Sequence, residues 1–115
     1  MERADRIVVA GMSRDANSIA RYDVAAATTL AVTKVVGYSA AVAALRERLT
    51  PDASVLLFGG AAKDFPYPGS TTLSAVNAAV TGMVRTLSVE LAPVRFNSLH
   101  TYLIEDSPFW SDKPE

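Results

Sequence analysis

The stretch Ser54-Val55-Leu56-Leu57-Phe58-Gly59-Gly60 is the centre of the pattern that decides the fold. A short apolar run that ends at two glycines is typical of a strand buried on both faces. A similar run, Ile7-Val8-Val9-Ala10, lies upstream and ends at Gly11. Downstream, Val94-Arg95-Phe96-Asn97-Ser98-Leu99 alternates between apolar and polar residues, which also predicts a strand.

A long alanine-rich segment separates the first two predicted strands. From Val24 to Leu49 the apolar residues recur at helical spacing, with one slip of phase around Gly37. Asp23 is predicted to cap this helix. Pro51 is predicted to end it, because the residue before a proline disfavours the α conformation. Gly37 either allows the close approach of another helix or is simply tolerated.

The second predicted helix follows a stiff loop, Phe65-Pro66-Tyr67-Pro68-Gly69. Ser70, Thr71 or Thr72 can cap the helix, which ends before Ala92-Pro93. One apolar stripe predicts the side that packs on the sheet, and it consists of Leu73, Val76, Val80, Met83, Leu87 and Leu91.

The order strand, helix, strand, helix, strand predicts an α/β unit with a three-stranded parallel sheet and two long helices. Such crossovers are right-handed, so strands in spatial order carry both helices on one face. The apolar runs nevertheless require burial of both faces. We therefore expect a second copy, another polypeptide or the tail Thr101 to Glu115 to cover the other face. This tail, residues 101–115, is predicted to be irregular, and its Phe109 and Trp110 are expected to pack.

Composition limits the classes of function. The chain has 115 residues, 50% of them hydrophobic, and is predicted to form one domain over residues 1–115. Its 11 basic and 12 acidic residues give a net charge of −1, so we expect no nucleic acid and no membrane partner. With no Cys and one His, disulfides, thiolate zinc sites and multi-histidine metal sites are excluded. The N-terminus, charged on both signs, does not read as a signal peptide, and a soluble, cytoplasmic domain is expected.

Three stretches point to a known family: Leu56-Leu57-Phe58-Gly59-Gly60, Pro66-Tyr67-Pro68-Gly69-Ser70 and Val84-Arg85-Thr86-Leu87-Ser88-Val89-Glu90-Leu91-Ala92-Pro93-Val94-Arg95-Phe96-Asn97. Together they resemble the second half of a short-chain dehydrogenase/reductase. On this resemblance, Ile7 to Gly11 is similar to the family's fourth strand and Val24 to Leu49 to its long interface helix. The resemblance implies a truncated, Rossmann-like unit whose two long helices form a dimer interface.

The chain departs from the family at the positions that carry its chemistry. The nucleotide-binding half, with its Gly-x-x-x-Gly-x-Gly turn, is absent from this sequence, so NAD(P) is not expected to bind. By spacing, Leu73 stands at the family's tyrosine, Asn77 at its lysine, Gly60 at its serine and Lys34 at its helix asparagine. Hydride transfer needs both a cofactor and a proton donor. The chain is therefore not expected to work as an NAD(P)-dependent oxidoreductase on its own.

Three residues remain as candidates for a site. Lys34 is either a base in the vestigial cleft or a lysine that extends to water. Asn77 either orients a ligand or is a satisfied polar residue near a helix start. His100 lies at the carboxyl end of the third strand, where open α/β sheets bind ligands, although it has no obvious acidic partner.

These observations favour a non-catalytic module that associates with itself or docks on a partner. A homodimer through the two long helices or through the exposed sheet face is expected. Two alternatives stay open. One is a small non-redox enzyme, an isomerase or cyclase, that uses the vestigial cleft and needs at least two of the candidate side chains within hydrogen-bond reach. The other is one part of a split NAD(P)-dependent oxidoreductase.

Overall fold

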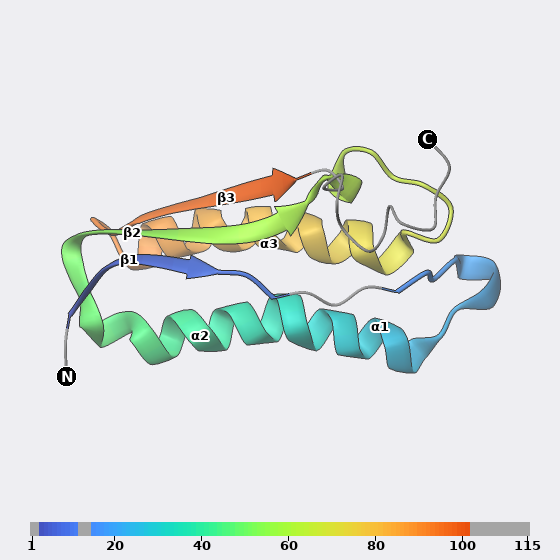
Figure 1. The fold of residues 1–115 in the computed structure, drawn as a ribbon, viewed down its shortest axis with the longest axis horizontal. Coiled ribbons are helices and arrows are strands. Elements are labelled where there is room, and N and C mark those ends of the chain that lie inside the picture. Colours follow the sequence, from blue (N-terminus) through green and yellow to red (C-terminus); the bar gives the residue numbers. More distant parts are fainter. Residues whose placement is uncertain (1–2, 12–14, 102–115) are drawn as a thin grey trace, which may run out of the picture.

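The computed structural model describes residues 3–11 and 15–101. They form a three-stranded parallel sheet with two long helical segments, which confirms the predicted α/β class (Figure 1). The sheet order is β1-β2-β3, with β2 in the middle. The strands are β1 (Ala4–Val9), β2 (Leu49–Gly60) and β3 (Arg95–Thr101), and the helices are α1 (Val24–Ala31), α2 (Gly37–Leu45) and α3 (Thr71–Glu90).

Both helical segments lie on the same face of the sheet. Val55 and Leu57 of β2 are buried in one cluster with Tyr38 of α2, Val80 of α3 and Phe96 of β3. Because side chains alternate along a strand, these contacts assign the odd-numbered residues of β2 to the covered face. In the described residues, the hydrophobic core therefore lies between the sheet and the helices, as the crossover argument predicted.

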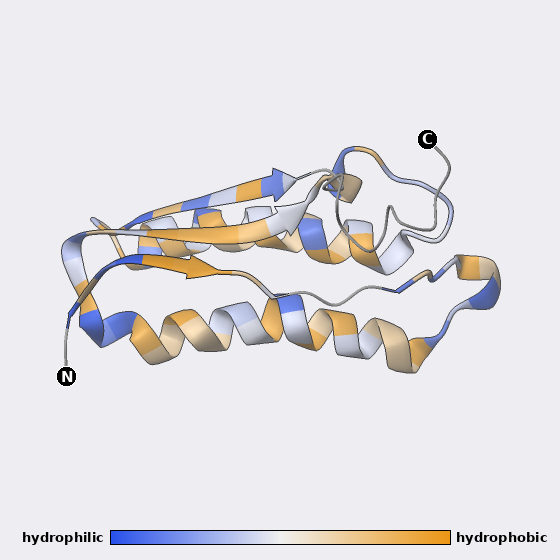
Figure 2. Ribbon diagram, in the orientation of Figure 1, coloured by the Kyte–Doolittle hydropathy of each residue, from blue (hydrophilic) through white to orange (hydrophobic). Residues whose placement is uncertain are grey.

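The opposite face of the sheet carries an exposed apolar patch beside polar residues. Val8 pairs with Leu56, and Phe58 pairs with Leu99, so these four side chains share the face away from the core. Val8 is 62% exposed and Leu99 46% exposed. Figure 2 shows apolar residues in the second half of β1 and in the middle of β2. The predicted irregular tail, with Phe109 and Trp110, lies outside the described residues beyond Thr101.

The first long helix contains a π-helical turn. Residues Val32–Val36 form this turn between α1 and α2, which accounts for the slip of phase in the sequence. A Cβ atom on Gly37 would lie 3.1 Å from the carbonyl oxygen of Val32. Gly37 therefore accommodates a carbonyl of its own helix. The predicted cap is confirmed, since the Asp23 carboxylate accepts a hydrogen bond from the backbone N–H of Ala26 at 3.1 Å.

The end of this helix differs from the prediction. Helix α2 ends at Leu45 and a 3₁₀ turn covers Arg46–Arg48, so the prediction of a helix through Leu49 was wrong. Leu49 instead begins β2, where it is buried and pairs with Ala4 of β1. Pro51 lies inside this strand rather than at the helix end. Pairing with β1 and burial in the core hold Leu49 in the extended conformation.

Candidate functional site

Two of the three candidate residues meet at the carboxyl end of the sheet. The Lys34 ammonium donates hydrogen bonds to Asn77 Oδ1 and to the carbonyl oxygen of Phe58, both at 3.3 Å. Lys34 is 7% exposed and Asn77 2% exposed. The ordinary expectation that Lys34 extends to water is therefore wrong. The π-helical turn carries Lys34 on the stripe of buried residues that faces the sheet.

Tyr38 completes this polar cluster and was not predicted. Its hydroxyl donates to the carbonyl oxygen of Phe58 at 2.6 Å and accepts from the backbone N–H of Gly11 at 3.1 Å. Lys34 Nζ lies 5.7 Å from the centre of the Tyr38 ring, within the range of a cation–π contact. The sequence feature that could have identified Tyr38 is its spacing, because Tyr38 follows Lys34 by one helical turn on the same face of the helix.

The two glycines at the end of β2 make room for side chains from other elements. A Cβ atom on Gly60 would lie 2.9 Å from Asn77 Nδ2. A Cβ atom on Gly59 would lie 2.4 Å from the His100 ring. The structure thus brings together three of the four positions at which the resembled family carries its tetrad: Lys34, Gly60 and Asn77. Leu73, at the fourth position, lies one helical turn before Asn77 and has no proton to donate.

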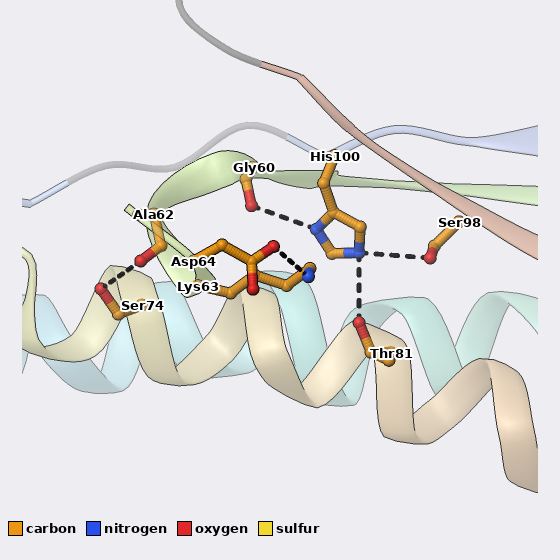
Figure 3. Close-up of polar contacts among 8 residues, drawn as sticks. All are labelled: Gly60, Ala62, Lys63, Asp64, Ser74, Thr81, Ser98 and His100. Carbon is orange, nitrogen blue, oxygen red and sulfur yellow. Dashed lines mark hydrogen bonds and ion pairs between the residues drawn. The ribbon is translucent and has the colours of Figure 1, made fainter. Parts of the chain in front are cut away.

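His100 is held in a separate set of hydrogen bonds (Figure 3). Its Nδ1 lies 3.1 Å from the carbonyl oxygen of Gly60, and its Nε2 lies 3.3 Å from Thr81 Oγ1 and 3.2 Å from Ser98 Oγ. A carbonyl only accepts, so Nδ1 carries the proton. Nε2 of the neutral ring then accepts from one of the two hydroxyls.

The surroundings of His100 favour its neutral form. Burial lowers the pKa of His100 below its ordinary value of 6.5, and the charges of Lys63 and Lys34 act in the same direction. The hydrogen bond to Gly60 and the charge of Asp64 oppose this shift of the pKa but are outweighed. Asp64 is itself ion-paired with Lys63 (Figure 3). At neutral pH His100 is an uncharged ring that connects β3 to β2 and α3.

The glycine pair Gly59-Gly60 does not form a phosphate cradle. A phosphate cradle needs glycines whose missing side chains leave the backbone open to the ligand. Here His100 and Asn77 occupy the space beside Gly59 and Gly60. Among residues 3–11 and 15–101, no group of three His, Asp or Glu side chains could hold a metal ion.

A second candidate surface lies on the helices, on the side turned away from the sheet. We call this surface, with its groove between α2 and α3, the helical face. The groove has a volume of about 490 Å³ and is lined by Val35, Ser39, Val42, Ala43, Ala79, Gly82, Met83, Thr86, Leu87 and Glu90. Val32 and Val36, 51% and 58% exposed, follow the same side of the first helix as Ser39 and Ala43.

The first helix is unusually apolar for its exposure. The segment Val24–Arg48 is long and apolar enough to cross a membrane, by length and composition alone, and 22% of its most apolar window is buried. Its apolar surface is therefore mostly open to water in the described part of the chain. Exposed apolar surface of this extent marks a site of interaction.

Comparisons with known proteins rest on the fold. No protein-family model and no curated protein matches the chain. A protein from Listeria innocua, 20% identical, superimposes with a TM-score of 0.86 over 96% of this chain and 55% of that chain. A short-chain dehydrogenase/reductase from Brucella melitensis, described as a glucose/ribitol dehydrogenase, is 24% identical, with a TM-score of 0.85 over 96% of this chain and 45% of that chain.

A third structure is slightly more similar in sequence. A small-chain dehydrogenase in complex with NADPH is 27% identical, with a TM-score of 0.80 over 86% of this chain and 46% of that chain. The chain therefore spans about half the length of the solved structures that it matches. Its fold is that of part of a short-chain dehydrogenase/reductase, which confirms the family resemblance predicted from the sequence.

Proposed function

We propose that this chain is a non-catalytic module that forms a homodimer through the helical face. The observation that carries the proposal is the exposed apolar side of the first helix beside the groove between α2 and α3. Val32, Val36, Ser39 and Ala43 recur every three or four residues, so they form one stripe along that helix. A second copy placed on this stripe removes it from water.

The chemistry of the groove supports a helix as its occupant. Small side chains at Ser39, Ala43, Ala79 and Gly82 allow a second helix to approach closely. A Cβ atom on Gly82 would meet nothing within 4 Å, so that position is open on the helical face. A two-fold axis through the groove would give both copies the same contacts. The family resemblance, which implies a dimer interface on the two long helices, adds support.

The polar groups at the end of the sheet support the absence of dehydrogenase chemistry. Leu73 cannot protonate a developing alkoxide. The Tyr38 hydroxyl and both ring nitrogens of His100 already have partners within the fold. A purified chain that reduced carbonyl compounds with NADPH, and lost this activity on substitution of a named residue, would overturn the non-catalytic part of the proposal.

The interface can be tested by the reactivity of single thiols, because the chain has no Cys of its own. Ala43→Cys places a thiol on the helical face and Leu99→Cys places one on the exposed sheet face. We expect the thiol at position 43 to react more slowly as the protein concentration rises, while the thiol at position 99 reacts at a constant rate. Equal behaviour of the two thiols would contradict the proposal. Flotation of a monomer with phosphatidylcholine vesicles would assign the helical face to a membrane instead.

The alternative of a small non-redox enzyme gains support from one observation. Lys34 and Asn77 lie within hydrogen-bond reach of each other at the carboxyl end of the sheet, as that hypothesis required. The groove described above, however, lies on the helical face, and its lining includes none of Lys34, Asn77 or His100. His100 bonds to Gly60, Thr81 and Ser98. The dimer is therefore the function that the geometry supports best.

A further inference from the structure

The groove of the helical face contains a side chain that can be modified chemically and then restored. We propose that Met83 is a reversible oxidation site, and that its conversion to the sulfoxide by a hydroperoxide dissociates the homodimer. This inference rests on the proposed homodimer and deepens it, because it names a chemical signal that regulates the same surface.

Met83 lies in the middle of the α3 side of the groove. Ala79 precedes it by one helical turn and Leu87 follows it by one turn, and all three line the groove. The Met83 side chain is partly buried and packs against the core. Its sulfur lies 3.7 Å from Ser39 Oγ in an exposed contact. The sulfur is therefore accessible to a small solute in the free chain, and a second copy in the groove would cover it.

The thioether of methionine reacts with a hydroperoxide by accepting one oxygen atom. The O–O bond breaks, an S–O bond forms on Met83, and the peroxide is reduced to water or an alcohol while the sulfur is oxidised. Methionine sulfoxide reductases reverse the step with thiols, which become a disulfide while the oxygen leaves as water. The chain has no Cys, so no thiol of its own competes for the peroxide.

The side chains that line the groove are poorly suited to a sulfoxide oxygen. The lining contains two hydroxyl groups, and each already donates a hydrogen bond within its own helix. Ser39 donates to the carbonyl oxygen of Val35 at 2.8 Å, and Thr86 donates to that of Gly82 at 3.3 Å. The carboxylate of Glu90 only accepts. Either hydroxyl would have to give up an existing bond to donate to the sulfoxide.

Oxidation therefore affects the dimer and the free chain differently. A thioether is apolar and flexible, so it packs well beside small side chains, whereas a sulfoxide is polar. In the free chain, water hydrates the new oxygen at the open groove. In the dimer the same oxygen loses that water and gains no donor, which is costly. The modification thus favours the monomer.

The test compares the dimer dissociation constant of each protein before and after treatment with hydrogen peroxide. Light scattering over a dilution series measures the constant, and peptide mass spectrometry measures the oxidised fraction of Met83. We expect oxidation to raise the constant of the wild type by about tenfold or more. Methionine sulfoxide reductase with a thiol should restore it.

Met83→Leu is the matched variant, because leucine has a similar volume and no sulfur. It keeps Met1 and Met12, which lie outside the described residues, so these two are still available for oxidation. Each protein is compared with itself, so a change in the starting constant does not affect the result. Peroxide should raise the constant of the wild type but not that of Met83→Leu.

The rate of oxidation gives a second readout. Oxidation of Met83 in the wild type should slow as the protein concentration rises, because the dimer covers the sulfur. In Val36→Glu, which places a charge on the helical face and should be monomeric, the rate should not depend on concentration.

Three results would overturn the proposal: a dimer that persists when Met83 is fully oxidised, an equal response of wild type and Met83→Leu, or loss of the circular dichroism of the folded chain on oxidation. A wild type that is monomeric before peroxide is added would overturn the homodimer as well. The state of the untreated chain therefore distinguishes failure of the homodimer from failure of the role of Met83.

Discussion

At the scale of single residues, the end of β2 shows what two glycines allow. The His100 ring packs against Gly59 and the Asn77 amide packs against Gly60. Both contacts are so close that a Cβ atom on either glycine would clash with the side chain. His100 then connects three elements, and Asn77 accepts from a buried ammonium. The polar groups at this edge of the sheet thus hold the fold together.

His100 should make the stability of the fold depend on pH. Its pKa is lowered in the folded state, mainly by burial, so the folded chain binds fewer protons than the unfolded chain near the ordinary value of 6.5. The stability that neutral His100 contributes is complete above 6.5 and is lost as the pH falls through the lowered folded value. Urea unfolding at several pH values measures this loss.

His100→Asn is the matched variant, because its amide can donate to Gly60 but does not titrate. The difference in the free energy of unfolding between wild type and His100→Asn should be larger at pH 7.5 than at pH 5 (roughly the range where an unperturbed histidine titrates). A difference that stays constant with pH, or increases toward low pH, would contradict the assigned neutral state.

The contact between Lys34 and Asn77 should appear as an energetic coupling. Hydrogen bonds to charged groups contribute about 1.5–3 kcal/mol, and loss of an acceptor beside a buried ammonium is costly. We expect Asn77→Ala to destabilise the chain by about 2 kcal/mol. In the Lys34→Met background, Asn77→Ala should lower the free energy of unfolding by less than it does in the wild type. A double-mutant cycle from urea unfolding measures the difference, and additive effects would contradict the contact.

Sequence reasoning found the residues of this cluster but not their pairing. Lys34 and Asn77 were candidates because their spacing places them at the family's tetrad positions, and His100 was a candidate because it lies at the carboxyl end of a strand. Lys34 and Asn77 are separated by 43 residues, so their contact depends on how two helices pack on one sheet. Tyr38 was missed because its hydroxyl partners, Gly11 and Phe58, come from two different strand ends.

At the scale of elements, two helical glycines should respond differently to alanine. Gly82→Ala should stabilise the chain by about 1 kcal/mol, because alanine favours the helix and nothing lies within 4 Å of the new methyl group. Gly37→Ala should gain less or destabilise, because its methyl group would lie 3.1 Å from the Val32 carbonyl. Urea unfolding in the Val36→Glu background, which we expect to be monomeric, compares the two. Equal stabilisation would contradict the π-helical turn.

The elements themselves were predictable where local chemistry dominates. Asp23 as a cap, and the slip of phase that marks the π-helical turn, are both local features of the sequence. The end of the first helix was not predictable in the same way. Leu49 belongs to a helical pattern in the sequence, but its pairing with Ala4 and its burial are tertiary contacts that override the local preference.

At the scale of the whole molecule, a small sheet leaves two apolar surfaces on opposite sides. The prediction that two helices would cover only one face is confirmed by the position of the core. The sequence could not identify what covers the other face, because an apolar pattern indicates that a surface is buried by a partner but not which partner it is. Cytoplasmic localisation and the absence of a membrane partner remain predictions.

The solution mass of the purified chain, measured by light scattering over a dilution series, tests the dimer most directly. We expect a mass of twice the chain mass of 12.2 kDa, which falls toward the chain mass on dilution. Val36→Glu should give the monomer. Val8 is a valine of similar exposure on the sheet face, so Val8→Glu is the control and should leave the dimer intact. A monomeric wild type, or a dimer that Val8→Glu abolishes and Val36→Glu does not, would contradict association through the helical face.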